Sequence, residues 1–263
     1  MKIRAGYEIS YDCVQPTPMI AMLNVHPSRT QDLVTPDLLL LHPEIPTNSY
    51  KDGFGNICHV IRAPKGRLTI SADFLIRDSG KPDEVAPDVE QYALEKLPVE
   101  TLVYLLGSRY CIIELAWAEF GNVQKGWPLV QTICDYVHNH LRFGYEHADP
   151  TKTAWQAHVE RRGVCRDFAH LAITLCRCMN VPARYCTGYL GDIGVPPEPQ
   201  PMDFSAWFEA YLGRWYTFDA RHNTPRVGRI LMARGRDATD VAIVTSFGPC
   251  TLANFRVITD EVT

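Results

Sequence analysis

The chain has 263 residues, of which 46% are hydrophobic and 21% are charged, an ordinary globular composition that excludes a disordered or fibrous protein. Lys and Arg number 26 against 30 Asp and Glu, which makes the formal net charge −4. This balance provides no basic footprint for nucleic acid and no field that would attract an anionic membrane. The length fits one large domain or two small ones.

The hydrophobic pattern predicts neither a membrane-spanning segment nor a signal peptide. The purest apolar run, Leu38–Leu41, is far shorter than the roughly 20 residues of a membrane span. Met1–Tyr11 alternates apolar with polar residues, which is a strand pattern and not the apolar core of a signal peptide. Nine cysteines, an odd number spread from Cys13 to Cys250, favour a reducing compartment over a disulfide framework. We therefore expect a cytoplasmic protein.

Residues up to about 95 are predicted to form an antiparallel β domain. Runs separated by Pro and Gly predict strands at Lys2–Asp12, Met19–Asn24, Asp37–His42, Ile57–Ala63 and Leu68–Ile76. The loop Asp52–Asn56, with two glycines, predicts a hairpin that leads into the strand at Ile57. The polar, proline-broken stretch Asp78–Val89 predicts a linker, so we divide the chain into residues 1–95 and residues 96–263.

The second part of the chain changes to the hydrophobic period of helices. Helices are predicted at Pro98–Leu106, Ile112–Phe120, Trp127–Leu141 and Thr153–Val159. Another helix is predicted to open at Gly163-Val164-Cys165, with Gly163 at the N-cap and Asp167 in the first turn, and to stop at Asn180 before Pro182. Strands follow at Ala183–Leu190, Phe204–Leu212 and Trp215–Ala220, the first two separated by the proline-rich loop Gly191–Asp203.

Cys165 is the candidate nucleophile. In the first turn of a helix, free N–H groups and the dipole stabilise a thiolate, so its pKa is expected below the free value of about 8.5. Buried packing is the commoner role of a cysteine, but Cys165 falls off the apolar stripe that Val164 and Phe168 define. Cys176 and Cys178 are interpreted as helix packing, because Cys-x-Cys inside a helix is a weak metal pattern.

The stretch Arg162–Leu171, R-G-V-C-R-D-F-A-H-L, closely resembles the core of the transglutaminase-like superfamily, which are papain-like cysteine enzymes of bacteria. The resemblance continues through Val181–Tyr185, Gly188–Leu190, Ala206–Tyr211 and Trp215–Asp219, and it includes the β-rich N-terminal part. It implies an α+β fold: an N-terminal antiparallel β domain, residues 1–95, followed by a papain-like core, residues 96–263, of helices packed on an antiparallel sheet.

The resemblance also implies thiol-dependent amide chemistry. Cys165 would attack a peptide or carboxamide carbonyl and form a thioester, which water or an amine then resolves by hydrolysis or transamidation. The implied substrate is a peptide, a protein or a small amide, and no metal or organic cofactor is needed. Asp219 matches the acid that orients the imidazole in the family's Cys-His-Asp triad. The backbone N–H of Cys165 is a natural oxyanion donor because it opens the helix.

The histidine of that triad belongs immediately before Ala206-Trp207, where this chain has Ser205. A serine hydroxyl cannot act as a general base near neutral pH. Two interpretations therefore stay open. The chain is either an enzyme in which another histidine supplies the base, or a catalytically impaired relative that keeps the cleft and binds peptides or a partner protein.

His222 is the candidate base, and its placement depends on the strand register. A two-residue hairpin loop would set His222 opposite Ser205 and turn Asp219 to the other face of the sheet. A three-residue loop would set Asp219 beside Trp207, on the face of Ser205, and turn His222 away. In a regular ladder only one of the two shares that face, and the alternative for His222 is a plain turn residue. The arginines at 221, 226, 229, 234 and 236 are interpreted as a solvated, ion-paired stretch.

Overall fold

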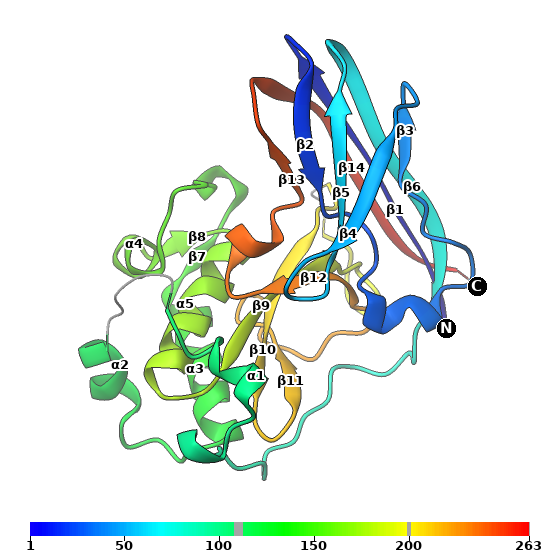
Figure 1. Cartoon of the computed structure of the whole chain (residues 1–263). Helices are drawn as coiled ribbons and strands as arrows, with labels where there is room; N and C mark the ends of the chain where they lie inside the picture. The colour runs from blue at the N-terminus through cyan, green and yellow to red at the C-terminus, as the bar shows by residue number, and fades with distance from the viewer. Residues whose placement is uncertain (108–112, 199–200, 263) are drawn as a thin grey trace.

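The computed structural model describes residues 1–107, 113–198 and 201–262. Figure 1 shows a β-rich half that contains both termini and a helical half, with one further sheet between them. In the described residues no helix is long and apolar enough to cross a membrane.

The β-rich half consists of two antiparallel four-stranded sheets. The first has the order β14-β1-β6-β3, with bounds Cys250–Val262, Lys2–Cys13, Gly66–Arg77 and Leu40–His42. The second has the order β13-β2-β5-β4, with bounds Val244–Ser246, Thr17–Ala21, Ile57–Ala63 and Thr47–Lys51. Their inward-facing residues form one buried core, which includes Ile3, Ile9, Met19, Ile61 and Phe74. The five predicted strands are confirmed, with ends shifted by a few residues.

The predicted hairpin at Asp52–Asn56 joins β4 to β5. The Asp52 carboxylate explains the turn, because its Oδ1 accepts the backbone N–H groups of Phe54 at 2.8 Å and Asn56 at 2.9 Å. Gly55 has a φ of 85°, which a side chain would disfavour.

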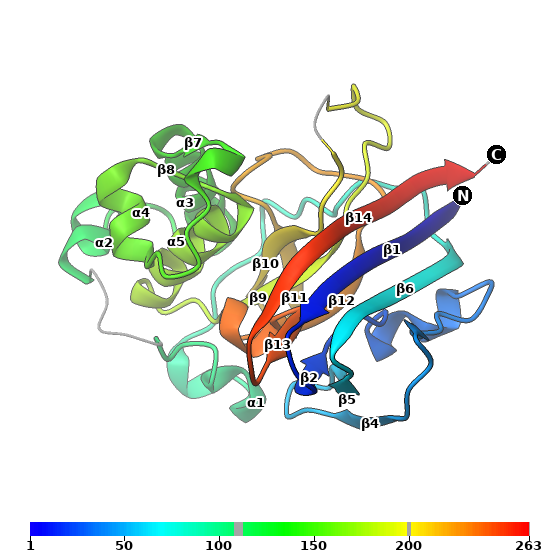
Figure 2. The same cartoon turned by 90° about the horizontal axis from the view of Figure 1, so that it is seen from above.

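The last strand of the chain returns to the first. β14 pairs along the whole length of β1 (Figure 2), and a disulfide joins Cys13 to Cys250 at the end of the pair. Residues 244–262, which the sequence placed in the second part of the chain, therefore complete the sheets of the β-rich half. The disulfide differs from the expectation drawn from the cysteine count, and its partners, 237 residues apart, carry no spacing that could reveal them. The division of the chain at residue 95 stays a prediction.

The helical half contains α1 (Val99–Leu102), α2 (Ile113–Phe120), α3 (Trp127–His140), α4 (Ala154–Glu160) and α5 (Cys165–Cys178). All five predicted helices are present; residue 112, the predicted start of the second, lies outside the described residues. Two short strands, β7 (Arg142–Phe143) and β8 (Arg162–Gly163), pair just before α5. Single 3₁₀ turns lie at Pro27–Asp32, Leu94–Lys96, Tyr145–His147 and Ala238–Val241.

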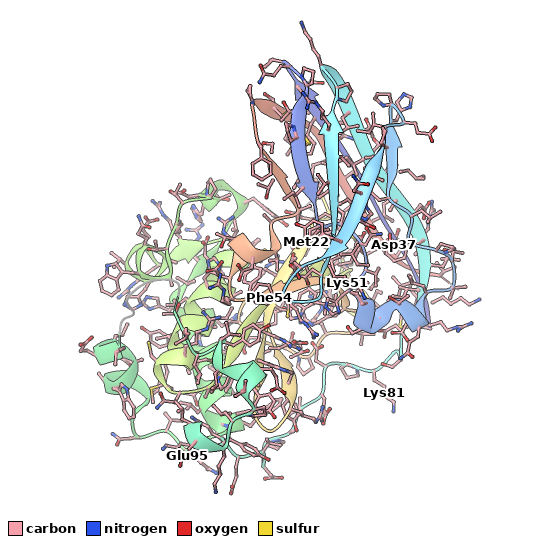
Figure 3. All side chains as sticks on the ribbon, in the orientation of Figure 1. Met22, Asp37, Lys51, Phe54, Lys81 and Glu95 are labelled. Atoms are coloured by element: carbon pink, nitrogen blue, oxygen red, sulfur yellow. A yellow bond between two sulfur atoms is a disulfide. The ribbon has the colours of Figure 1, made fainter. Side chains whose placement is uncertain are left out.

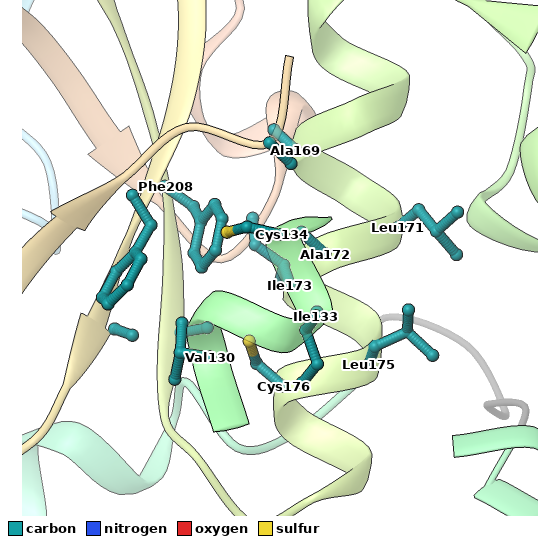
Figure 4. Packing of buried hydrophobic residues seen from close by; sticks show 14 of the residues in the cluster. Val130, Ile133, Cys134, Ala169, Leu171, Ala172, Ile173, Leu175, Cys176 and Phe208 are labelled. Carbon is teal, nitrogen blue, oxygen red and sulfur yellow. The ribbon is translucent and has the colours of Figure 1, made fainter. Parts of the chain in front are cut away.

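The sheet between the two halves has the order β11-β10-β9-β12, with bounds Trp215–Phe218, Ser205–Tyr211, Ala183–Tyr189 and Ile230–Gly235. The apolar faces of α3 and α5 pack together against this sheet, and Figure 4 shows Ile133, Ala172 and Cys176 from the helices near Phe208 of β10. Burial of this stripe is what fixes α5, and therefore its first residue, relative to the sheet. The α+β fold predicted from the sequence is confirmed, with helices packed on an antiparallel sheet beside a β-rich half whose core includes Tyr189 and Ile230 of that sheet.

Candidate active site

Cys165 is the first residue of α5, so the structure confirms its place at a helix N-terminus. The N-cap is Val164, not Gly163 as predicted, because the Asp167 side chain folds back and accepts the Val164 N–H at 2.9 Å. That carboxylate leaves no room at Gly163, where a Cβ would lie 2.6 Å from the Cβ of Asp167. As the first helical residue, Cys165 has no carbonyl one turn earlier in the helix to accept its own N–H.

The register of β10 and β11 follows the three-residue loop. Tyr211 pairs with Trp215 and Phe208 pairs with Phe218, so the ladder ends just before Asp219. The two-residue alternative is therefore wrong. The expectation that this register turns His222 away is also wrong, because it assumed a regular ladder through residue 222 and the strand stops at Phe218.

Asp219 and His222 form a side-chain pair in the turn that follows β11. Asp219 Oδ1 accepts the backbone N–H groups of Arg221 at 3.0 Å and His222 at 3.1 Å, which bends the chain. The bend brings His222 Nδ1 to 2.8 Å from Asp219 Oδ2. Because an ionised carboxylate only accepts hydrogen bonds, the imidazole donates from Nδ1, and Nε2 is the ring nitrogen that Asp219 leaves unengaged. His222 is thus both a turn residue and the partner of Asp219.

Asp219 is buried beside a buried guanidinium. Arg229 Nη2 donates to Asp219 Oδ2 at 2.9 Å, and Arg229 Nε donates to Asp83 Oδ2 at 2.8 Å. Burial alone would raise the pKa of Asp219, but Arg229 and the hydrogen bond from His222 outweigh it and hold that pKa well below its usual range. Asp219 is therefore ionised at neutral pH. The prediction of a solvated arginine stretch is wrong for Arg226 and Arg229, which are buried, although both are ion-paired.

Cys165, Ser205 and His222 line one cavity of about 190 Å³. Acidic and basic side chains share its wall, among them Asp203 and Arg221. The Oγ of Ser205 is buried and has no hydrogen-bond partner among the described residues, so it is free to meet a group that enters the cavity. The structure therefore brings Cys165, the imidazole of His222 and Ser205, which stands at the expected histidine position, to the same cavity.

The thiol of Cys165 is not acidified as its helix position predicts. Burial, and after it Asp203, raise the pKa of this thiol, while the Arg221 guanidinium and the Ala206 N–H lower it; together they bring the pKa to about 11. Loss of hydration outweighs the helix dipole, which typically contributes no more than about 2 kcal/mol. At neutral pH the nucleophile is consequently a thiol, and attack on a carbonyl requires a base that takes its proton.

The other free cysteines among the described residues are buried. Cys176 and Cys178 lie in the buried cluster between α5 and its neighbours, which confirms the prediction for them. The described part of the chain contains no group of three His, Cys, Asp or Glu residues arranged to hold a metal ion.

The sequence did not single out the charged residues that shift the pKa values of Asp219 and Cys165. Arg229, Asp83 and Asp203 reach the site from segments that carry no motif, and Asp83 lies in the stretch predicted to be a linker. That stretch lacks helices and strands, as predicted, yet its carboxylate accepts from both the backbone of Arg226 and the side chain of Arg229. Only the run of arginines after Asp219 could have hinted at a buried cation.

Comparisons with known proteins agree with the fold. Residues 120–220 match the family model described as the transglutaminase-like superfamily. The chain is similar to the crystal structure of a "Putative Cysteine Protease" from Cytophaga hutchinsonii, with 28% identity and a TM-score of 0.85 over 100% of this chain and 91% of that one.

Two curated mycobacterial relatives are uncharacterized proteins. The one from Mycobacterium leprae is 38% identical over 87 residues, which is 31% of this chain and 30% of that protein. The one from Mycobacterium tuberculosis is 26% identical over 216 residues, which is 73% of this chain and 68% of that protein. The match thus spans under a third of the first relative's length. The family match and the solved structure together support thiol-dependent amide chemistry as a class.

Proposed function

Residues 120–220 of this chain form a transglutaminase-like core domain, and from that premise we propose that the protein catalyses amide hydrolysis or transamidation through a thioester on Cys165. His222 is the general base and Asp219 orients it. The observation that carries the proposal is the 2.8 Å contact between His222 Nδ1 and Asp219 Oδ2, made by a ring that lines the same cavity as Cys165. The substrate is a peptide, a protein or a small amide.

In the first step, His222 Nε2 takes the proton of the Cys165 thiol while the sulfur bonds to the carbonyl carbon. The C=O electron pair moves to oxygen, and the backbone N–H of Cys165 donates to that oxyanion. The buried, ionised Asp219 stabilises the imidazolium that forms. Because the resting thiol has a raised pKa, proton transfer to His222 accompanies attack instead of preceding it.

In the second step, the oxyanion collapses, the C–N bond breaks, and the imidazolium gives its proton to the departing amine. The thioester is then resolved by the same groups: His222 deprotonates water or an acceptor amine, which attacks the carbonyl carbon and releases the thiol. Ser205 Oγ, buried and unpartnered in this cavity, is proposed as a second donor to the oxyanion.

The alternative function is a binding module without catalysis, and the observation that favours it is Ser205 at the position where the family has histidine. The pair made by Asp219 and His222 weighs against it, because it supplies the imidazole that Ser205 cannot. The two functions differ in what the chain does to a protein substrate, and this can be measured.

The test uses an unfolded protein such as reduced casein, offered with and without a primary amine. Hydrolysis of peptide bonds creates new N-termini, whereas transamidation or deamidation of glutamine releases ammonia. We expect one of these products from the wild-type chain and none from Cys165→Ala. If neither product forms, and Cys165→Ala binds casein as tightly as wild type does, the binding module is the correct function. Cys178→Ala is the matched control, because Cys178 is a packing cysteine outside the cavity.

A further inference from the structure

A second and larger cavity, of about 300 Å³, lies away from Cys165. Its floor is the sheet, where Trp207, Thr217 and Leu231 line it, and its rim is formed by the segments around Arg29 and Lys81. Figure 3 shows Lys81 on the extended segment that follows β6. Arg226 alone lines both this cavity and that of Cys165. A volume near 300 Å³ is at the small end of the range for ligand pockets.

The charged residues of this cavity do not balance. Five basic and three acidic side chains line it, and each of the three acids already has a partner. Asp78 lies 3.5 Å from Arg29, Asp83 lies 2.8 Å from Arg229, and Glu209 lies 2.5 Å from Arg184, which is outside the lining. Two of the bases, Lys81 and Arg234, make no ion pair within the part of the chain that the structure describes.

Arg229 adds a hydrogen-bond donor that is held in place. Its Nε and Nη2 are taken by Asp83 and Asp219, and its guanidinium carbon lies 5.2 Å from the centre of the Trp207 ring. The side chain of Arg229 is only 7% exposed, and its buried Nη1 has no hydrogen-bond partner among the described residues. A buried donor of this kind costs free energy unless an acceptor meets it. The same contact to Asp219 connects this donor with the pair in the other cavity.

We propose that this cavity binds a small oxyanion, a carboxylate or a phosphate, whose oxygen accepts from Arg229 Nη1 and whose charge is balanced by Arg234 and Lys81. Guanidinium groups suit both anions because their planar donors match paired oxygens. Burial and the neighbouring Arg184 lower the pKa of Arg234, and Glu209, which is ion-paired with Arg184, opposes them only in part. Anion binding here uses neither Cys165 nor His222, although Arg226 and the contact of Arg229 with Asp219 connect the two cavities.

The experiment measures binding to the full chain by calorimetry and by thermal unfolding. The probes are succinate and inorganic phosphate, with succinamide as the neutral analogue of succinate and sodium chloride to match ionic strength. A probe at ten times its Kd should raise Tm by about 3–6 °C, whereas succinamide should not. Whether succinate or phosphate gives the shift identifies the type of oxyanion. Measuring the same shift in Cys165→Ser separates this site from the proposed activity.

Variants locate the anion. Arg234→Gln should weaken binding about tenfold, since a charged hydrogen bond is lost. Lys81→Gln should weaken it about two- to fivefold, and because Lys81 is exposed this variant remains informative if Arg234→Gln does not fold. Arg67→Gln, which removes the same charge from an exposed pair with Asp12, should change nothing. The proposal is overturned if neither oxyanion stabilises the chain more than chloride, or if the shift is undiminished in both cavity variants.

Discussion

The carboxylate of Asp219 holds His222 twice, accepting its backbone N–H at 3.1 Å and its ring Nδ1 at 2.8 Å. The turn after β11 therefore places an imidazole in the cavity of Cys165, whereas β10 has Ser205 at the position where a histidine was expected. Under the proposed function, the base would therefore occupy a different position in the chain while the acid keeps the position that the family resemblance implies.

Removal of the His222 imidazole should lower amide turnover by about 10²–10⁴-fold, the range typical of a general base. The variant His222→Ala tests this with the casein assay, and His222→Asn keeps a hydrogen bond to Asp219 without supplying a base. Because position 205 lines the same cavity as Cys165, adding Ser205→His to His222→Ala should recover at least about tenfold of the loss. Undiminished turnover in His222→Ala would exclude His222 as the base.

Cys165 should be the cysteine that reacts first with iodoacetamide, because it is the most exposed free cysteine among the described residues. Its raised pKa, about 11, makes labelling slow at pH 7 and about tenfold faster for each pH unit up to 10, since only the thiolate reacts. Peptide mapping of a labelling time course at each pH measures both properties.

Substitutions of two charged residues near Cys165 should change its labelling rate in opposite directions. Asp203→Asn removes a negative charge that raises the pKa of the thiol, so labelling at a fixed pH should become faster. Arg221→Gln removes a positive charge that lowers it, so labelling should become slower. A rate that is independent of pH near neutrality would contradict the neutral thiol and indicate a preformed thiolate–imidazolium pair.

Arg229 should be a large contributor to stability, because it is buried between the two carboxylates of Asp83 and Asp219. Arg229→Met leaves both carboxylates without their cation, and breaking a buried pair in this way costs about 3–5 kcal/mol of unfolding free energy. Urea denaturation followed by fluorescence measures the difference. Arg67→Met, at an exposed ion pair with Asp12, is the control and should cost no more than about 1 kcal/mol. Equal losses in the two variants would show that Arg229 is not a structural cation.

Features that depend on residues close in sequence could be predicted, whereas those that depend on contacts between distant segments could not. Cys165 was predictable because helix capping and the apolar stripe of α5 act within a few residues. The bend at Asp219 was not, because it depends on the strand ending at Phe218, and a strand pattern does not show where pairing stops. Arg229 was not predictable either, since its partner Asp83 is 146 residues away in a segment without regular structure.

The same reasoning explains the thiol. A local argument from the helix N-terminus predicts a lowered pKa, but the pKa depends on how much of the sulfur the rest of the fold covers. Asp203 and Arg221, two of the groups that shift this pKa, come from the loop before β10 and the turn after β11, both distant from Cys165 in sequence. The fold class, which follows from periodicities summed over long segments, was accordingly predicted better than the electrostatics of single atoms.

Folding stability should fall as the pH drops from 6.5 to about 4, in part because of His26. This side chain is 3% exposed, and its Nδ1 accepts the Ser28 N–H at 3.1 Å. Burial, together with Arg234 and Arg184, lowers the pKa of His26 to about 4. Between these pH values the unfolded chain binds the proton and the folded chain does not, so protonation favours unfolding. The loss of unfolding free energy attributable to His26 approaches about 3 kcal/mol at the acid end.

The variant His26→Asn tests this, because it keeps an acceptor for the Ser28 N–H and cannot titrate. Its unfolding free energy should match that of wild type above pH 7 and should be the higher of the two as the pH falls toward 4. Urea denaturation of both chains at a series of pH values measures this, and parallel curves down to pH 4 would show that His26 is not held neutral by the fold.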